Sequence, residues 1–270
     1  MVLAVLSAST YANGDTGAET DADALAERAL RTEPSEALIH VRTLERRASI
    51  DASHALLRIA RHGPRAARPG ALLALGRVGI RTRKSVGYLR DRAKNSLDAA
   101  ERAAALEALG FMASMEEDAE TLIAALDSDV GCLRTGAYRG IRHLSGQRLP
   151  ASPRRIEAWW RSFRNRGRRQ LEASLDSIQQ LADEGLSADD PAWGRQRARL
   201  RQYGWIDLTL VSERIESWLR SPHASLEAEA LGTISALRLG DFERVLRGRA
   251  GGRNPPASLV QALETLGIVP

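Results

Sequence analysis

The sequence predicts an all-α protein, an α-α superhelix of stacked antiparallel helix pairs, and two observations support this prediction. First, the good helix formers Ala, Leu, Arg and Glu dominate the 270 residues, whereas the alternating Val, Ile and Thr runs that are typical of strands are missing. Second, one pattern of residue types recurs at intervals of 34 and 32 residues. Repeats of this length are typical of a solenoid in which each helix pair packs on the next.

The first 20 residues carry a different pattern from the rest of the chain. A short apolar run at residues 2–6 precedes small residues that end at Ala12, which fits a small-x-small cleavage site. The positive start and longer apolar region of a complete signal peptide are missing. Residues 1–20 are therefore interpreted as a truncated signal peptide, which predicts an exported or periplasmic protein, or as a disordered tail of a cytoplasmic one. No apolar run reaches 18 residues, so no transmembrane segment is predicted.

Residues 21–146 are predicted to form the repeats. Three segments align on an alanine with an arginine three positions before it, and the aligned pairs are Arg68 with Ala71, Arg102 with Ala105, and Arg134 with Ala137. Another small residue follows each alanine after three positions. We predict that each segment is the second helix of a pair and that its small residues lie where neighbouring helices approach closely.

The first helices of the pairs are predicted from amphipathic segments at 52–61, 84–94, 116–126 and 213–219. The last of these belongs to a fourth copy, because residues 126–144 align without a gap on residues 219–237. A helix pair cannot bury its apolar face alone, so the pairs are predicted to stack. The alternative is a bundle of Ala-rich helices whose similarity arises by chance.

The third repeat, DSDVGCLRTGAYRGIRHLSGQ at 127–147, resembles the HEAT-repeat family in its order of Asp, apolar residue and Arg, Ala and Leu. In that family an Asp in the inter-helix turn and an Arg in the second helix link successive repeats. Asp129 and Arg134 match both positions, whereas Arg68 and Arg102 match the Arg alone. The resemblance implies a solenoid fold, and it covers residues 50–146 well and 208–240 weakly.

The region 147–185 is predicted to be a helical joint rich in Trp and Arg. Residues 144–147 (LSGQ), followed by a Trp-bearing helix, are similar to bacterial HEAT-repeat proteins of unassigned role that are often exported. Ser152-Pro153 is typical of a helix start. Trp159 and Trp160 then lie on one apolar stripe of the helix. This stripe favours a buried plug at the end of the three-repeat stack, and the alternative is a stacking platform for bases or sugars.

Arginines gather in the same region, where residues 134–169 contain eleven arginines and one acid. A GC-rich genome, which favours Arg codons, is the preferred explanation of a general excess of Arg, and selection for guanidinium contacts to anions is the alternative. The candidate anion- or partner-binding residues are Arg154, Arg155, Arg161, Arg164, Arg166, Arg168 and Arg169. They either bind an anionic partner or pair with the acidic residues at 116–120.

The remaining residues, 186–270, are predicted to be C-terminal helical repeats. The acidic, small-residue segment at 183–191 is the best linker candidate, and residues 258–266 are predicted to form a short closing helix.

Motifs that carry catalytic chemistry are missing from the sequence. The five histidines show no paired ligand spacing, Cys132 is the only cysteine, and no phosphate-binding or nucleophile-elbow motif occurs. No metal, no cofactor and no enzymatic activity are therefore predicted. The predicted function is a non-catalytic scaffold for protein–protein interaction in the bacterial envelope, with an unidentified protein partner and weak polyanion binding. The alternative is a nucleic-acid-binding protein similar to the HEAT-like alkylpurine DNA glycosylases, with residues 134–169 as its basic groove.

Overall fold

The computed structural model describes residues 22–147, 149–150, 152–186, 190–251 and 255–268, so the predictions for residues 1–20 fall outside the described chain. The described residues form α-helices and short 3-10 turns without a strand, and none of these helices is long and apolar enough to cross a membrane. The α-helices are α1 (Ala22–Arg31), α2 (Pro34–Arg47), α3 (Ile50–His62), α4 (Arg68–Val78), α5 (Arg83–Asn95), α6 (Ala99–Met112), α7 (Glu116–Ala124), α8 (Gly131–Ser145), α9 (Pro153–Asp183), α10 (Pro191–Tyr203), α11 (Leu208–Leu219), α12 (Ala224–Leu237), α13 (Glu243–Ala250) and α14 (Ala257–Leu266).

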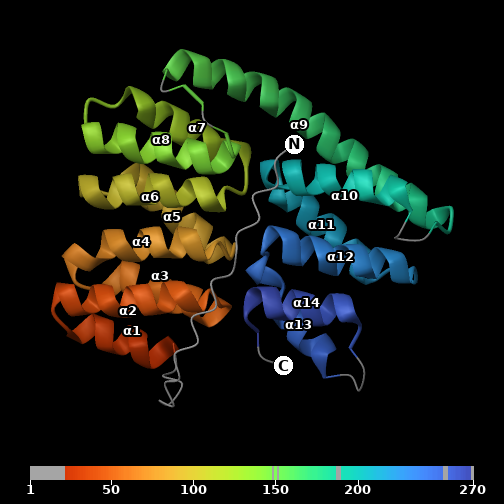
Figure 1. Cartoon of the computed structure of the whole chain (residues 1–270), viewed down its shortest axis with the longest axis horizontal. Helices are drawn as coiled ribbons and strands as arrows, with labels where there is room; N and C mark the ends of the chain where they lie inside the picture. The colour runs from red at the N-terminus through yellow and green to blue at the C-terminus, as the bar shows by residue number, and fades with distance from the viewer. Residues whose placement is uncertain (1–21, 148, 151, 187–189, 252–254, 269–270) are drawn as a thin grey trace.

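Helices α1 to α8 form a first stack, which occupies one side of the molecule (Figure 1). Helices α2, α4, α6 and α8 pack on one another in that order, and α3, α5 and α7 form the neighbouring layer. The aligned alanines Ala71, Ala105 and Ala137 lie on α4, α6 and α8 and are fully buried. The predicted all-α fold of stacked helix pairs is confirmed, and the predicted first helices at 52–61 and 84–94 lie within α3 and α5.

Close backbone contact between α6 and α8 explains the small residues at their interface. A Cβ atom placed on Gly110 would lie 2.1 Å from the carbonyl oxygen of Gly140, and one placed on Gly136 would lie 2.4 Å from that of Ala103. No real Cβ atom tolerates such distances, so only glycine permits this approach. The predicted close approach at the small-residue positions is thereby confirmed for this helix pair.

Helix α9 leads from the first stack to a second one. Its 31 residues cross the end of the molecule, and α10 to α14 then descend beside the first stack (Figure 1). In the second stack α10, α12 and α14 pack in one layer. The fourth copy and the closing segment lie on α12 and α14 as predicted, and the linker candidate at 183–191 begins where α9 ends.

The two stacks meet along a seam of inter-helix turns, a feature that the sequence does not predict. The turns after α2, α4 and α6 face the turns after α14, α12 and α10. At one level the amide of Leu208 donates to the carbonyl oxygen of Ser114 over 3.0 Å. At the next level Arg81 pairs with Leu239 in an isolated parallel β-bridge. The helical repeat therefore does not continue as an open superhelix but folds back on itself.

Arg81 is the central contact of the seam. Its Nε donates to the carbonyl of Ala113 (3.3 Å) and its Nη2 to that of Phe111 (2.9 Å), both in the first stack. Its Nη1 donates to the carbonyl of Leu237 (2.8 Å), which belongs to the second stack. Burial lowers the pKa of Arg81 to about 10, and the positive charge of Arg238 lowers it further. One guanidinium group thus ties the ends of α6 and α12 together.

Candidate functional site

Helix α9 carries the arginines that the sequence analysis singles out. It begins at Pro153, as predicted, although the Ser152 side chain makes no capping hydrogen bond. The carbonyl of Ser152 instead accepts from the amide of Ile156 at 3.0 Å. The buried side of α9 is formed by Ile156, Trp160, Gly167, Leu171, Ser174, Leu175, Ile178 and Ala182. The opposite side of the helix is therefore available to other molecules.

An aromatic cluster fixes the first half of α9 against the start of the second stack. Trp160 is 4% exposed, and its ring stacks on that of Trp205 with 5.9 Å between the ring centroids. Trp205 lies in the 3-10 turn Gly204–Ile206, and Phe163 packs between Trp205 (5.7 Å) and Tyr203 (5.4 Å). Trp159 is half-buried and stacks on Phe163 at 5.3 Å. Trp160 is thus buried as predicted, but it packs on an aromatic residue of the second stack as well. The predicted plug involved the first stack alone.

Two of the seven candidate arginines are engaged within the protein. Arg164 donates to Glu120 at 3.0 Å and lies 4.0 Å from Glu116. Arg168 lies 3.9 Å from Glu116 and 3.6 Å from Glu172. Pairing with the acids of α7, one of the two alternatives for the basic region, therefore holds for these two side chains.

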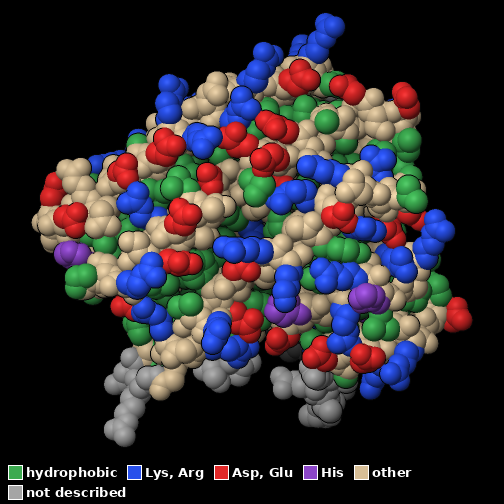
Figure 2. Space-filling model, turned by 180° about the vertical axis from the view of Figure 1, so that it is seen from behind, with side chains coloured by type: hydrophobic (Ala, Val, Ile, Leu, Met, Phe, Trp, Pro, Cys, Tyr) green, Lys and Arg blue, Asp and Glu red, His purple; other side chains and the backbone are tan. Residues whose placement is uncertain are grey.

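The other five candidate arginines are exposed, and the described residues provide no ion pair for them: Arg154, Arg155, Arg161, Arg166 and Arg169. We call these five the outer arginine face. They extend over about 22 Å of helix axis, at about 1.5 Å per residue. Positively charged side chains project along the upper edge of the molecule, where α9 crosses both stacks (Figure 2). The outer arginine face is therefore an exposed ridge of positive charge on a helix that is held in place.

The arginines predicted to link repeats behave differently from one another. Arg68 lies 3.8 Å from Glu101 on the next repeat. Arg134 donates to the carbonyl of Ser128 in its own turn, at 2.7 Å. Asp129 is exposed and makes no ion pair within the described chain, so the Asp–Arg link that the HEAT resemblance implies does not form here. The short turn before α8 brings the Ser128 carbonyl close to Arg134. The guanidinium group of Arg134 therefore binds this carbonyl.

Arg102, the third arginine predicted to be structural, also makes no inter-repeat ion pair in the described chain, and its buried Nε has no hydrogen-bond partner there.

Other ion pairs join successive repeats, although they were not predicted from the sequence. Arg90 holds the fully buried Asp118 with two hydrogen bonds, of 2.8 and 3.2 Å. Further pairs of this kind are Arg65–Asp98, Arg77–Glu45, Arg139–Glu107 and Arg197–Glu229. Their partners lie one repeat length apart, so opposite charges at the repeat interval were a usable signal.

Comparisons with known proteins supply no family for this chain. No family model matches it, and no curated protein matches it. An engineered protein of known structure matches with 14% identity over 91% of this chain and 96% of its own, at a TM-score of 0.35. The complex of CpcE and CpcF of phycocyanin lyase from Nostoc sp. PCC7120 matches with 17% identity over 96% of this chain and 92% of that chain, at a TM-score of 0.37. Both similarities are too distant to assign an activity.

Proposed function

We propose that this chain is a non-catalytic helical-repeat scaffold that binds an acidic surface of a protein partner through the outer arginine face. One observation carries the proposal. Five arginines of α9 are exposed and have no ion pair in the described chain, whereas two others on the same helix are paired. An unpaired guanidinium group presents five donors in a planar fork that matches a carboxylate.

The rigidity of α9 supports this proposal. The helix is packed against α7, α10 and α12, and the aromatic cluster around Trp160 and Trp205 holds its first half. Side chains on a fixed helix lose less freedom on binding than those on a loop, because the backbone is already ordered. Arginine is also among the residues enriched at protein interfaces.

The shape of the surface favours a protein over a nucleic acid as the partner. The outer arginine face lies on a helix that runs along the outside of both stacks (Figure 1), and it is not the basic groove that the glycosylase-like alternative requires. Its five arginines neutralise at most about five phosphates. Since nucleic-acid affinity grows with the number of phosphates neutralised, such a ridge is expected to bind DNA weakly.

The proposal is tested with R155Q/R166Q, which removes two arginines that lie about three turns apart on one side of α9. We expect the wild-type protein to bind fluorescent poly-L-glutamate at low salt and R155Q/R166Q to bind it about tenfold more weakly. The unfolding midpoint in urea should stay unchanged, because exposed substitutions alter stability by no more than about 0.5 kcal/mol. Fluorescence anisotropy measures the affinity.

The matched control is R42Q/R46Q, which removes two exposed arginines from α2, in the part of the first stack remote from α9 (Figure 1). If this control weakens binding as much as R155Q/R166Q, only net charge matters and the proposed surface is wrong.

A labelled DNA duplex serves as the second probe. Tighter binding of DNA than of poly-L-glutamate, with a steep salt dependence that R155Q/R166Q flattens, would assign the surface to nucleic acid.

A further inference from the structure

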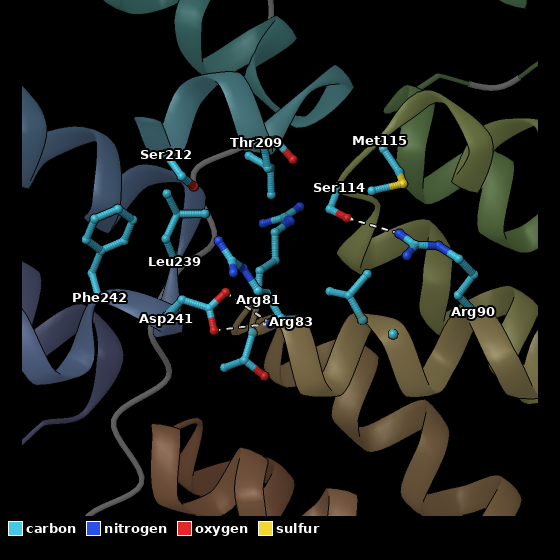
Figure 3. Close-up of a pocket in the computed structure, with 14 residues that line it drawn as sticks. Arg81, Arg83, Arg90, Ser114, Met115, Thr209, Ser212, Leu239, Asp241 and Phe242 are labelled. Carbon is cyan, nitrogen blue, oxygen red and sulfur yellow. Dashed lines mark hydrogen bonds between the residues drawn. The ribbon is translucent and has the colours of Figure 1, made fainter. Parts of the chain in front are cut away.

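A cavity lies in the seam between the two stacks, away from the outer arginine face. Its volume is about 150 Å³, and the start of α5, the turn before α7, the start of α11 and the turn after α12 surround it. Side chains from the first stack face side chains from the second across it (Figure 3). The walls combine apolar and charged groups, which is the composition of a small-molecule site. The charged lining residues are Arg81, Arg83, Arg90 and Asp241.

The three arginines that line the cavity differ in how far their positive charge is neutralised. Arg90 is neutralised by Asp118, with which it shares two hydrogen bonds. Arg81 donates three hydrogen bonds to described residues, all of them to backbone carbonyls and none to a carboxylate. The guanidinium group of Arg83 makes no hydrogen bond or ion pair with the described residues. Two guanidinium groups therefore retain an uncompensated positive charge at the cavity.

Among the described residues, one carboxylate lines the cavity, and it already accepts hydrogen bonds. Asp241 accepts two hydrogen bonds from the backbone amide of Arg83, of 3.0 and 3.2 Å, at the start of α5 (Figure 3). Its single charge opposes those of Arg81 and Arg83. Arg238 adds a further positive charge nearby and, after burial, is the second cause of the lowered pKa of Arg81. An anion in the cavity would relieve this repulsion.

The apolar part of the cavity sets the size of a ligand. Val86, Met115, Leu208, Leu239 and Phe242 contribute apolar surface, and Gly87 leaves room where another residue would place a side chain. A buried cavity of about 150 Å³ in another protein holds one molecule of benzene. One ring or a short hydrocarbon chain therefore fits, with its charged end toward Arg81 and Arg83.

We propose that this seam cavity binds a small organic anion, a carboxylate or a phosphate monoester with a compact apolar body. The anionic group lies against the guanidinium groups of Arg83 and Arg81, and the apolar body lies against Met115 and Phe242. Since the walls come from both stacks, a bound anion joins them. The site is separate from the outer arginine face and does not depend on the function proposed for it.

Isothermal titration calorimetry of the full chain at low ionic strength tests the site with benzoate and phenyl phosphate as probes. We expect at least one of them to bind with a Kd below about 10 mM, and neutral benzyl alcohol to bind at least about tenfold more weakly. The tighter of the two anions identifies the head group as carboxylate or phosphate. Failure of both anions to bind, or equal binding of benzyl alcohol, would overturn the proposal.

Two variants locate the binding. R83Q removes the unpaired guanidinium group and is expected to weaken anion binding about tenfold, because a charge-assisted hydrogen bond is lost. Gly87→Leu keeps every charge but fills the cavity, since a Cβ at Gly87 meets no atom within 4 Å, and it should abolish binding. R42Q, a matched loss of one exposed arginine on α2, should bind as the wild type does. Wild-type affinity in both R83Q and Gly87→Leu would show that the anion binds elsewhere.

Discussion

At the scale of single residues, Arg81 shows why arginine is suited to the seam. Carbonyl groups at the end of a helix lack partners within the helix, and buried ones must find a donor elsewhere. The planar guanidinium group reaches Phe111 and Ala113 on one side and Leu237 on the other. A lysine would offer one compact ammonium group instead of a fork, so it cannot replace this geometry.

Replacing Arg81 with methionine should destabilise the protein. Methionine has a similar length, but it leaves three carbonyls without their donor, and an unsatisfied buried polar group costs about 1–3 kcal/mol. Relief of the buried charge offsets part of this cost, so we expect the free energy of unfolding to fall by about 2–3 kcal/mol. Urea denaturation followed by circular dichroism measures the change.

Arg83 provides the control for this measurement, because it lies two residues away and its exposed guanidinium group has no partner among the described residues. R83Q should change the free energy of unfolding by no more than about 0.5 kcal/mol. Equal losses in R81M and R83Q would mean that the carbonyl contacts of Arg81 contribute nothing specific.

At the scale of helices, the sequence predicted the pairs well because their signals are local. Apolar periodicity, Ser152-Pro153 and the aligned alanines all act within one helix or between neighbours, and each led to the correct helix. The inter-repeat links expected of Asp129 and Arg134 do not form in the described chain, because Arg134 bonds a nearer acceptor, the Ser128 carbonyl, which the sequence pattern does not reveal. Similarly, the sequence could not divide the arginines of α9 into paired and unpaired ones, because that depends on the rotation of α9 relative to Glu116 and Glu120.

Two glycine-to-alanine substitutions in helices should have opposite effects on stability. Gly110→Ala places a methyl group 2.1 Å from the Gly140 carbonyl, so α6 and α8 must separate, at a cost of about 1–3 kcal/mol or more. Gly87→Ala meets no atom within 4 Å and should stabilise α5 by about 0.5–1 kcal/mol, because alanine loses less backbone freedom. Urea midpoints of the two variants test this, and a loss in both would argue against the close backbone packing of α6 and α8.

At the scale of the whole molecule, the seam is the feature that the sequence could not predict. Its contacts join turns that are far apart in the chain, such as Ala48 with Arg238 over 190 residues. They are made largely by backbone groups, which leave no pattern in the amino-acid sequence. The seam cavity could not be predicted either, because its lining residues come from turns and helix starts that are far apart in the chain. An open superhelix was the natural extrapolation from repeats that contact only their neighbours.

The seam should make the two stacks unfold together. All five tryptophans lie between Trp159 and Trp218, on α9 and the second stack, so their fluorescence reports that part of the molecule. Circular dichroism reports the helices of both stacks. We expect the two urea transitions to coincide in the wild-type protein and to separate in R81M, because the central seam contact is then lost. Separate transitions in the wild type would show that the seam does not couple the stacks.

The seam also has a consequence for the speed of folding. In an open array of repeats nearly every contact is local, and proteins rich in local contacts fold fast. Here the guanidinium group of Arg81 must find Leu237 across 156 residues, and Arg238 must find Ala48 across 190. Closing loops of that length lowers chain entropy before any seam contact forms. This chain should therefore refold more slowly than an open helical array of equal length, although almost all of its secondary structure is local.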